Sequence, residues 1–471
     1  MRVLIFFILL CICKINLISR PNIVLIMTDD QGWGQTGYMN HPILKTPNLD
    51  KMAKNGICFK RFYAGGPVCS PTRATVLTGR THDRTGVFNH GFPLRLQEKT
   101  LSQALLKAGY ATGHFGKWHL NGLRGPGVPI IDSYPNGPKD FGFQKWVSVT
   151  NFFDLNPIMS QNGVFKDFKG DSSEIIVDEA LLFIEKQKKK EKPFFCVIWY
   201  GTPHSPFMAQ ENDRLDFIKL DESSRDHHAE LKAMDRSIGS FRKGLRKLSI
   251  ENNTIVWFMS DNGGLSNINP STTGGLRGFK GSLYEGGIRV PCVIEWPDGI
   301  TFPRDTNYPA GAVDIFPTIS DIVGLSNESC IYPQDGESLL KLFSQELPNR
   351  KKPLVFSSND RMAIIDNNWK LLSLPNKNSN NLELYDLSKD SSENTNLKNK
   401  NHKIYLNLNK LLEVNRKSIQ QSIQGKDYKE GFVNKQPPRI FWNEIKEYEK
   451  YFSDWKNRPE YILVTIDIIY Q

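Results

Sequence analysis

Residues 22–34 read NIVLIMTDDQGWG: an unbroken apolar run, then two adjacent carboxylates and a glycine-rich turn. An apolar run of this length is typical of a β-strand that is buried on both faces of a parallel sheet. Asp29 and Asp30 follow at its carboxyl end, the edge at which such sheets bind ligands. Adjacent carboxylates repel each other unless a cation lies between them, and their oxygens suit Ca²⁺ or Mg²⁺. The stretch therefore predicts a buried strand and, unless the pair is an ordinary solvated turn, a metal-binding loop.

The same arrangement recurs at residues 254–264, which read TIVWFMSDNGG. Asp261 supplies another carboxylate, Asn262 a neutral oxygen ligand, and the two glycines let the chain turn tightly. A tight Asn-Gly hairpin turn is the structural alternative. Because the carboxyl ends of parallel strands meet at one edge of a sheet, the two loops could converge on a shared metal site.

Further β-branched runs alternate with amphipathic helical stretches, which indicates an α/β fold with a largely parallel sheet. Besides the two runs above, the expected buried strands lie at residues 111–115, 194–200 and 290–295. One expected helix begins at Thr46-Pro47, and three others cover residues 101–108, 172–188 and 224–248.

The composition changes where Pro348 and Pro353 bracket a polar run, after which the chain is rich in Asn, Lys and Ser. This change predicts a boundary between a main domain at residues 20–348 and a smaller α+β domain at residues 349–471. In the second domain, LVFSS, AIID and WKLLSL predict a small antiparallel sheet, and residues 376–403 are expected to form loops.

The overall composition excludes several classes of protein. With 471 residues and 39% hydrophobic residues, the chain can bury a sizeable core, so it is neither disordered nor fibrous. A net charge of +10 suits an anionic partner without choosing among nucleic acid, acidic lipid and a sulfated polysaccharide. Basic and aromatic residues do not interleave in the way that binds nucleic acid, so no nucleic-acid partner is expected.

The first residues differ from the rest, because Arg2 precedes an apolar run at residues 3–13. This pattern predicts a signal peptide over residues 1–19, since the run is short for a membrane span; a first core strand is the alternative. A secreted or lysosomal protein, or a periplasmic one in a bacterium, is therefore expected. Asn252 and Asn327 begin N-x-Ser/Thr triplets, which fit glycosylation in that pathway.

Five cysteines follow residue 19, too few in so long a chain for a disulfide scaffold. Cys196 and Cys292 lie in apolar runs and are expected to be buried free thiols.

Cys69 opens the sequence Cys69-Ser70-Pro71-Thr72-Arg73. This segment resembles the formylglycine motif of the sulfatase family, in which Cys, any residue, Pro, a small hydroxyl residue and Arg direct enzymatic oxidation of the cysteine. The family most often has Ser where this chain has Thr72, and the hydroxyl is kept.

Other motifs resemble the same family in order and spacing, over about residues 21–390. They are TPNLD, GYATGHFGKWHL, TPHSP, SDNGG, GFKGSLYEGGIRVP, and a late WKLL with LYDL. The resemblance implies an alkaline-phosphatase-like fold, with a large mixed, mostly parallel sheet flanked by helices and a smaller C-terminal antiparallel-sheet domain. It implies a sulfuric ester hydrolase that converts aryl sulfates or sulfated glycans to alcohol and inorganic sulfate. The chain looks closest to arylsulfatases and galactosamine 6-sulfatases.

The resemblance also implies a cofactor site. One Ca²⁺ per chain would be bound by Asp29, Asp30, Asp261 and Asn262, and completed by Cys69 after a formylglycine-generating enzyme has oxidised it. The hydrated aldehyde would be the nucleophile. Its second hydroxyl can expel sulfate, whereas a sulfated thiol would have no easy exit.

Fixed cations must hold the charge of the sulfate group, and proton transfers need groups that titrate near the working pH. Lys117 and Lys280 resemble the sulfate-binding lysines of the family, and Arg73 the arginine that orients the nucleophile. His204 resembles the leaving-group acid, assisted by Lys280, and His119 the histidine that contacts the nucleophile.

Two histidines outside these motifs, His227 and His228, lie on a charged helix and are expected to be solvated. The motifs name neither the substrate nor the oligomeric state. Residues 123–170 and the loop after Phe207 are candidates for the wall that selects the substrate.

A phosphodiesterase or phosphonate hydrolase would share the fold, although most such phosphatases bind two zinc ions and use Ser or Thr as the nucleophile. An inactive glycan-binding scaffold, with Cys69 left as a thiol, is the non-enzymatic alternative.

Overall fold

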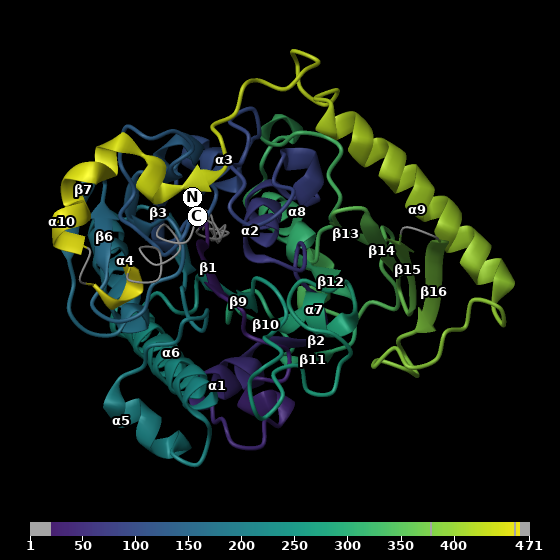
Figure 1. Cartoon of the computed structure of the whole chain (residues 1–471), viewed down its shortest axis with the longest axis horizontal. Helices are drawn as coiled ribbons and strands as arrows, with labels where there is room; N and C mark the ends of the chain where they lie inside the picture. Colours follow the sequence, from purple (N-terminus) through teal and green to yellow (C-terminus); the bar gives the residue numbers. More distant parts are fainter. Residues whose placement is uncertain (1–19, 377–378, 456–457, 462–471) are drawn as a thin grey trace, which may run out of the picture.

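The computed structural model describes residues 20–376, 379–455 and 458–461, so the expected signal peptide at residues 1–19 lies outside the described residues. An eleven-stranded mixed sheet forms the centre of the described chain, with helices on both faces (Figure 1). Its strands follow the order β11 (Arg304–Thr306), β2 (Ile57–Tyr63), β10 (Arg289–Glu295), β9 (Thr254–Ser260), β1 (Asn22–Thr28), β8 (Phe194–Trp199), β3 (Ala111–Lys117), β5 (Lys145–Val149), β6 (Ile158–Gln161) and β7 (Val164–Asp167), and the short β12 (Ala310–Gly311) pairs with β2.

The directions of the strands bring several of their carboxyl ends to one edge of this sheet. Strands β9, β1, β8, β3 and β5 run parallel to one another, so their carboxyl ends lie at the same edge. Strand β10 runs antiparallel to β9 and β2, and β6 runs antiparallel to β5. The predicted large, mixed, mostly parallel sheet is therefore confirmed, and all five expected strands are present.

The central strands are buried on both faces, which explains their unbroken apolar runs. In β1, Ile23, Leu25 and Met27 point to one core and Val24 and Ile26 to the other. The first core is covered by α2 (Cys69–Thr78), α3 (Leu101–Lys107) and α8 (Ile315–Val323). The second is covered by α1 (Pro47–Asn55), α4 (Ser172–Lys189) and α6 (Glu222–Lys247), beside which lies the short α5 (Glu211–Arg214).

A second, antiparallel sheet follows in the chain, with strands β13 (Leu354–Ser358), β14 (Arg361–Asp366), β15 (Trp369–Asn376) and β16 (Ser379–Asp386). The small antiparallel sheet was predicted, but the expectation of loops throughout residues 376–403 is wrong, because β16 pairs with β15 along its length. Polar residues dominate that strand, and among its residues whose exposure is described only the last three, Leu384, Tyr385 and Asp386, are buried. Helix α9 (His402–Ile423) packs on this sheet.

After α9 the chain returns to the large sheet, as the yellow segment at the top of Figure 1 shows. Strand β17 (Ile440–Phe441) pairs in parallel with β4 (Leu123–Arg124). Trp442 and the residues around α10 (Phe452–Trp455) form an aromatic cluster against Leu123 and neighbouring residues. The last described residues are thus anchored beside the carboxyl end of β3. Among the described helices, none has the length and apolar character needed to cross a bilayer.

Buried charges join the two sheets. Lys370 on β15 is fully buried, and its Nζ lies 2.9 Å from Glu285 Oε1 and 2.8 Å from Glu393 Oε1. Glu285, in α7 (Glu285–Ile288), also accepts a 3.0 Å hydrogen bond from the Tyr63 hydroxyl and lies 3.5 Å from Arg289. Burial raises the pKa of Glu285, but Lys370 and Arg289 outweigh it, so the net shift is downward. The lysine therefore keeps a buried carboxylate ionised between the sheets.

Lys370→Met is expected to lower the free energy of unfolding by about 3–5 kcal/mol, because it leaves buried carboxylates without their cation. Chemical denaturation measures the change. Lys389→Met is the matched control: Lys389 is 83% exposed and lies 3.8 Å from Asp386, so its loss should change stability by at most about 0.5 kcal/mol. Equal effects of the two substitutions would contradict the structural role of Lys370.

Candidate active site

The two loops that carry the paired polar residues meet at the carboxyl edge of the large sheet. Strands β1 and β9 are in register up to Thr28 and Ser260, so the loops begin side by side. The Asp30 amide donates to Asp261 Oδ1 at 3.1 Å, and Asn262 Nδ2 donates to Asp30 Oδ1 at 2.7 Å. The two loops therefore converge, as their position at parallel strand ends predicted.

Cys69 reaches this point from the first residue of α2 and is almost fully buried. Its Sγ donates to Asp29 Oδ1 at 3.2 Å. Ligand atoms of Asp29, Asp30, Cys69 and Asp261 all lie within 4.8 Å of one another. Burial, followed by the charges of Asp261 and Asp29, raises the pKa of the Cys69 thiol well above its ordinary value. An unmodified thiol is therefore protonated here and a poor nucleophile.

The residues after Cys69 have structural reasons for their identity. Thr72 Oγ1 accepts hydrogen bonds from the amides of Gly65 and Gly66 at 2.9 and 3.1 Å, a role that any small hydroxyl residue fills. Arg73 is fully buried, and its Nη2 donates to Asp261 Oδ2 at 2.7 Å. Its Nη1 donates to the Lys117 carbonyl at 3.0 Å, which ties α2 to the end of β3.

Three cations face the three carboxylates. Lys117 Nζ contacts Asp29, Lys280 Nζ donates to Asp30 Oδ2 at 2.7 Å, and Arg73 pairs with Asp261. The side chains of Arg73 and Lys117 are fully buried, whereas the Lys280 side chain is 22% exposed. Lys280 therefore lies on the open side of the cluster.

Burial and nearby charges shift the pKa values of Asp29 and Asp261 in opposite directions. Burial raises the pKa of Asp29, but Lys117, His204 and Arg73 outweigh it and lower the pKa well below its ordinary value. Burial and repulsion by Asp29 raise the pKa of Asp261 to about 7, against the attraction of Arg73.

Next to these carboxylates, Asn262 Oδ1 is buried without a hydrogen-bond partner. An orphaned amide oxygen beside three buried carboxylates fits a hard divalent cation such as Ca²⁺. Asp29, Asp30, Asp261 and Asn262 could therefore hold such an ion, together with residue 69.

His204 and His119 approach the cluster from different strands. His204 follows β8, its ring stacks on Phe152 at 4.6 Å between centroids, and its Nδ1 donates to the Ser205 carbonyl at 2.5 Å. Its Nε2 consequently points inward, 3.9 Å from Asp30 Oδ2. Burial, then Lys280, lowers the pKa of His204 to about 4.

His119 follows β3 in the left-handed region at φ 54°, and both of its ring nitrogens are buried without a partner among the described residues. Burial, then Lys117, lowers the pKa of His119 well below its ordinary value, so the ring is neutral. Its carbonyl accepts a 2.7 Å hydrogen bond from Ser70 Oγ, so the imidazole is held beside the residue that follows Cys69. Unpartnered nitrogens on a strained residue are typical of a functional site.

The expectation that His227 and His228 are solvated is wrong, because both side chains are fully buried. They lie on the apolar stripe of α6, which the charged residues of the opposite face obscure in the sequence. His227 Nε2 lies 2.7 Å from Gln35 Nε2, in the loop after Asp30, and its ring packs against Phe207 at 5.0 Å between centroids. The helix therefore braces two loops of the site, a role that no motif signalled.

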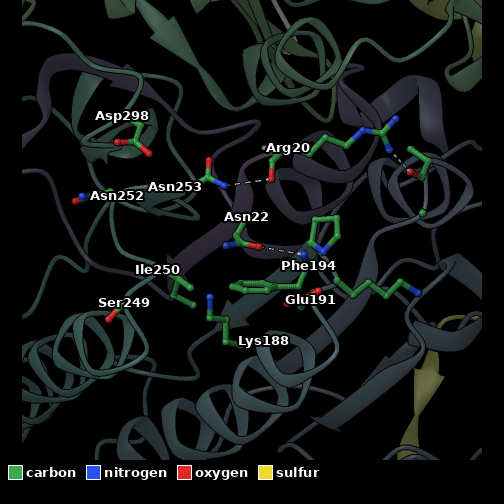
Figure 2. Close-up of a pocket in the computed structure, with 14 residues that line it drawn as sticks. Arg20, Asn22, Lys188, Glu191, Phe194, Ser249, Ile250, Asn252, Asn253 and Asp298 are labelled. Atoms are coloured by element: carbon green, nitrogen blue, oxygen red, sulfur yellow. Dashed lines mark hydrogen bonds between the residues drawn. The ribbon is translucent and has the colours of Figure 1, made fainter. Parts of the chain in front are cut away.

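Other predicted residues lie elsewhere. Cys196 and Cys292 are buried free thiols, as predicted, and Asn252 and Asn327 are exposed. A cavity of about 840 Å³ lies at the amino ends of β1 and β8, with Asn252 in its wall (Figure 2). None of the predicted catalytic residues lines it, because they lie at the opposite edge of the sheet.

Comparisons with known proteins agree with this geometry. Residues 21–325 match the family model described as sulfatase, and residues 278–421 match the model of the C-terminal part of N-sulphoglucosamine sulphohydrolase. The chain is 32% identical to the N-acetylgalactosamine-6-sulfatase of Sus scrofa over 375 residues, which cover 73% of this chain and 70% of that protein. The match to the enzyme of Canis lupus familiaris, also 32% identical, covers 66% of this chain and spans 63% of the relative.

Solved structures share the fold. The structure of Ps i-CgsB is 25% identical, with a TM-score of 0.75 over 93% of this chain and 98% of that one. The phosphonate monoester hydrolase of Agrobacterium radiobacter, 19% identical, aligns over 89% of this chain and 100% of that one with a TM-score of 0.59, a likeness of fold alone. The predicted alkaline-phosphatase-like fold is thus confirmed. Since the sulfatase model covers more than half of the sequence and relatives with that name match most of it, the chain belongs to the sulfatase family.

Proposed function

We propose that this protein hydrolyses sulfate esters and that residue 69, after oxidation to formylglycine, provides the nucleophile. The observation that carries the proposal is the buried cluster of Asp29, Asp30, Cys69 and Asp261, whose ligand atoms lie within 4.8 Å of one another at the carboxyl edge of the sheet. The relatives named as sulfatases support the reaction class. Faster turnover of an aryl phosphate than of the matching aryl sulfate would instead favour a phosphoester hydrolase.

Two groups would complete the site. One Ca²⁺, held by Asp29, Asp30, Asp261, Asn262 and residue 69, would supply positive charge to the sulfate oxygens. The hydrated formylglycine would supply one hydroxyl that attacks sulfur and a second that allows sulfate to leave. Arg73, which bonds Asp261 and the end of β3, keeps one acidic ligand and the lysine segment in place.

Differences in exposure indicate where the alcohol leaves. Arg73 and Lys117 are sealed inside the protein, but Lys280 is 22% exposed and His204 is 18% exposed. The bulky leaving group must therefore lie on the side of Lys280 and His204. The bond from His204 Nδ1 to the Ser205 carbonyl fixes the ring with Nε2 toward the site. The low pKa of His204 belongs to the site without substrate, and the negative charge of a bound sulfate group favours the imidazolium form, whose Nε2 proton can pass to the departing oxygen.

His119 is assigned to the nucleophile rather than to the leaving group. Its unpartnered ring nitrogens and its carbonyl bond to Ser70 support a role beside the nucleophile, where a neutral imidazole can accept a proton from a hydroxyl. Lys117 and Lys280 hold the negative charge of the sulfate group meanwhile. Every residue assigned here lies within residues 20–348, the proposed catalytic domain. The proposed smaller domain is residues 349–471, whose segment from β17 onward packs against the catalytic domain.

The names of the relatives also bear on substrate and compartment. An N-acetylgalactosamine-6-sulfatase acts on a sulfated sugar, so a sulfated glycan is the proposed physiological substrate. Secretion, oxidation of Cys69 by a formylglycine-generating enzyme, and glycosylation at the exposed Asn252 and Asn327 belong to the same proposal.

Asp261→Asn is expected to abolish Ca²⁺ binding and lower aryl sulfate turnover by about 10²-fold or more, because it removes one charged ligand while keeping the shape of the side chain. Elemental analysis and turnover assays check this. Asp298→Asn, an exposed aspartate at the opposite edge, is the control and should match the parent. Full parental activity after exhaustive chelation would argue against the metal site.

His204→Ala should slow alkyl sulfates by about 10² to 10⁴ more than a nitrophenyl sulfate, because only a poor leaving group needs a proton. Steady-state kinetics on the two substrates give the ratio. Equal losses on both would show that His204 is not the acid.

Cys69→Ser should release about one alcohol per active site and stop, because a single hydroxyl can attack sulfur but cannot then eliminate sulfate. A burst assay counts the alcohol, and peptide mass should show an added SO₃ group on the introduced hydroxyl. The parent peptide should carry the aldehyde in place of the thiol. Parental turnover by the variant would rule out the formylglycine mechanism.

A further inference from the structure

Two arginines without acidic partners lie at the rim of the proposed sulfate site. Arg124 ends β4, and Arg439 lies just before β17, more than 300 residues later in the chain. The charged neighbour that acts on Arg439 is Arg124, and burial together with this repulsion lowers the pKa of Arg439. In the described part of the chain, no carboxylate forms an ion pair with either guanidinium.

The chain holds this pair in a defined position. Strand β17 places Phe441 opposite Arg124, whose guanidinium lies 4.3 Å from the centroid of the Phe441 ring. Arg439 Nε donates to the His90 carbonyl at 2.9 Å, its Nη2 bonds His90 Nε2 at 3.0 Å, and its guanidinium lies over the Phe92 ring. Both arginines are thus oriented by aromatic rings and backbone rather than by acids.

The pair is close to the reacting groups. A β-carbon on Gly91 would lie 3.7 Å from Arg439 Nε, 3.8 Å from His119 Nε2 and 3.1 Å from Arg124 Cγ, so all three side chains border one point. The Gly91 amide donates to Ser70 Oγ at 2.8 Å, which ties this loop to the residue after Cys69.

The basic groups of the rim and of the sulfate site also act together on His90. Partial burial lowers the pKa of His90, and Arg439, Arg124, Lys280 and Lys117 lower it further. One imidazole therefore lies within the electrostatic reach of both sets of cations.

The charge balance of the two regions differs. Lys117, Lys280 and Arg73 are matched by three carboxylates, whereas among the described residues no carboxylate pairs with the two rim arginines, which repel each other. Two like charges held together and partly buried destabilise each other, and an anion between them relieves that repulsion through charge-assisted hydrogen bonds. A substrate with a single sulfate would leave Arg124 and Arg439 without a negative counter-charge.

We propose that Arg124 and Arg439 bind a second anionic group of the substrate, carried by the sugar next to the one whose sulfate ester is cleaved. The inference rests on the proposed sulfatase function and deepens it. The substrate class is an oligosaccharide or polysaccharide with acidic groups on adjacent sugars, and the second group is a carboxylate or a sulfate, since guanidinium groups bind both. The C-terminal segment is then a part of the substrate site.

Three disaccharides of equal length test this proposal: one with a single sulfate and a neutral neighbour, one with a uronate neighbour, and one with a sulfated neighbour. Arg439→Gln and Arg124→Gln should each lower kcat/KM for at least one acidic disaccharide by about 10- to 100-fold, mainly through KM. The neutral disaccharide should be cleaved at the parental rate, within about twofold, and Arg416→Gln on α9 should match the parent on all three. The acidic disaccharide that suffers the larger loss identifies the group that is bound.

Two controls separate the possible failures. The neutral disaccharide and the melting temperature report whether a variant is folded, and calorimetric binding to Cys69→Ala with and without Arg439→Gln measures affinity without turnover. Equal losses on neutral and acidic disaccharides, or none on any, would overturn the rim site while leaving the proposed function intact. A parent protein that cleaves no sulfate ester at all would instead overturn the proposed function, and this inference with it.

Discussion

Three buried carboxylates with oxygens within 4.8 Å of one another are the constraint around which this molecule is arranged. Asp29, Asp30 and Asp261 meet because two adjacent parallel strands end at the same height, and their mutual repulsion demands positive charge from every side. Lys117 comes from the end of β3 and Lys280 from the segment before β10. The sheet order therefore decides which cations can reach the acids, and the acids decide which side chains may be buried there.

The parts of the fold that could be predicted from the sequence are those where local pattern and tertiary role coincide. The apolar runs of β1 and β9, each ending in polar residues, specify strand, burial and position together. Strand β16 could not be found in this way, because most of its residues are polar, it pairs with β15 through the backbone, and the residues buried in it are confined to its end. The burial of His227 and His228 cannot be read from the sequence for a related reason: charges on one face of α6 conceal how completely the other face is covered.

For the candidate site, the positions of the loop carboxylates and the glycine-flanked lysines could be anticipated, but partners distant in sequence could not. The pairing of Arg73 with Asp261 joins residues 188 positions apart. The approach of Arg439 to His90 joins residues 349 positions apart and depends on the aromatic cluster around Trp442. The periodicity of the sequence does not encode such contacts, because they depend on how the two sheets and α9 pack together.

The depth of Cys69 has a consequence for how the protein matures. All ten residues of α2 are buried and the cysteine is only 1% exposed, so a second protein cannot grasp this segment once the surrounding sheet has closed. The proposed oxidation of Cys69 by a partner enzyme would therefore have to be finished while the segment is still an unfolded peptide. Under that proposal, the relative rates of oxidation and folding would fix the active fraction of a preparation, and no later treatment of the folded chain would change it.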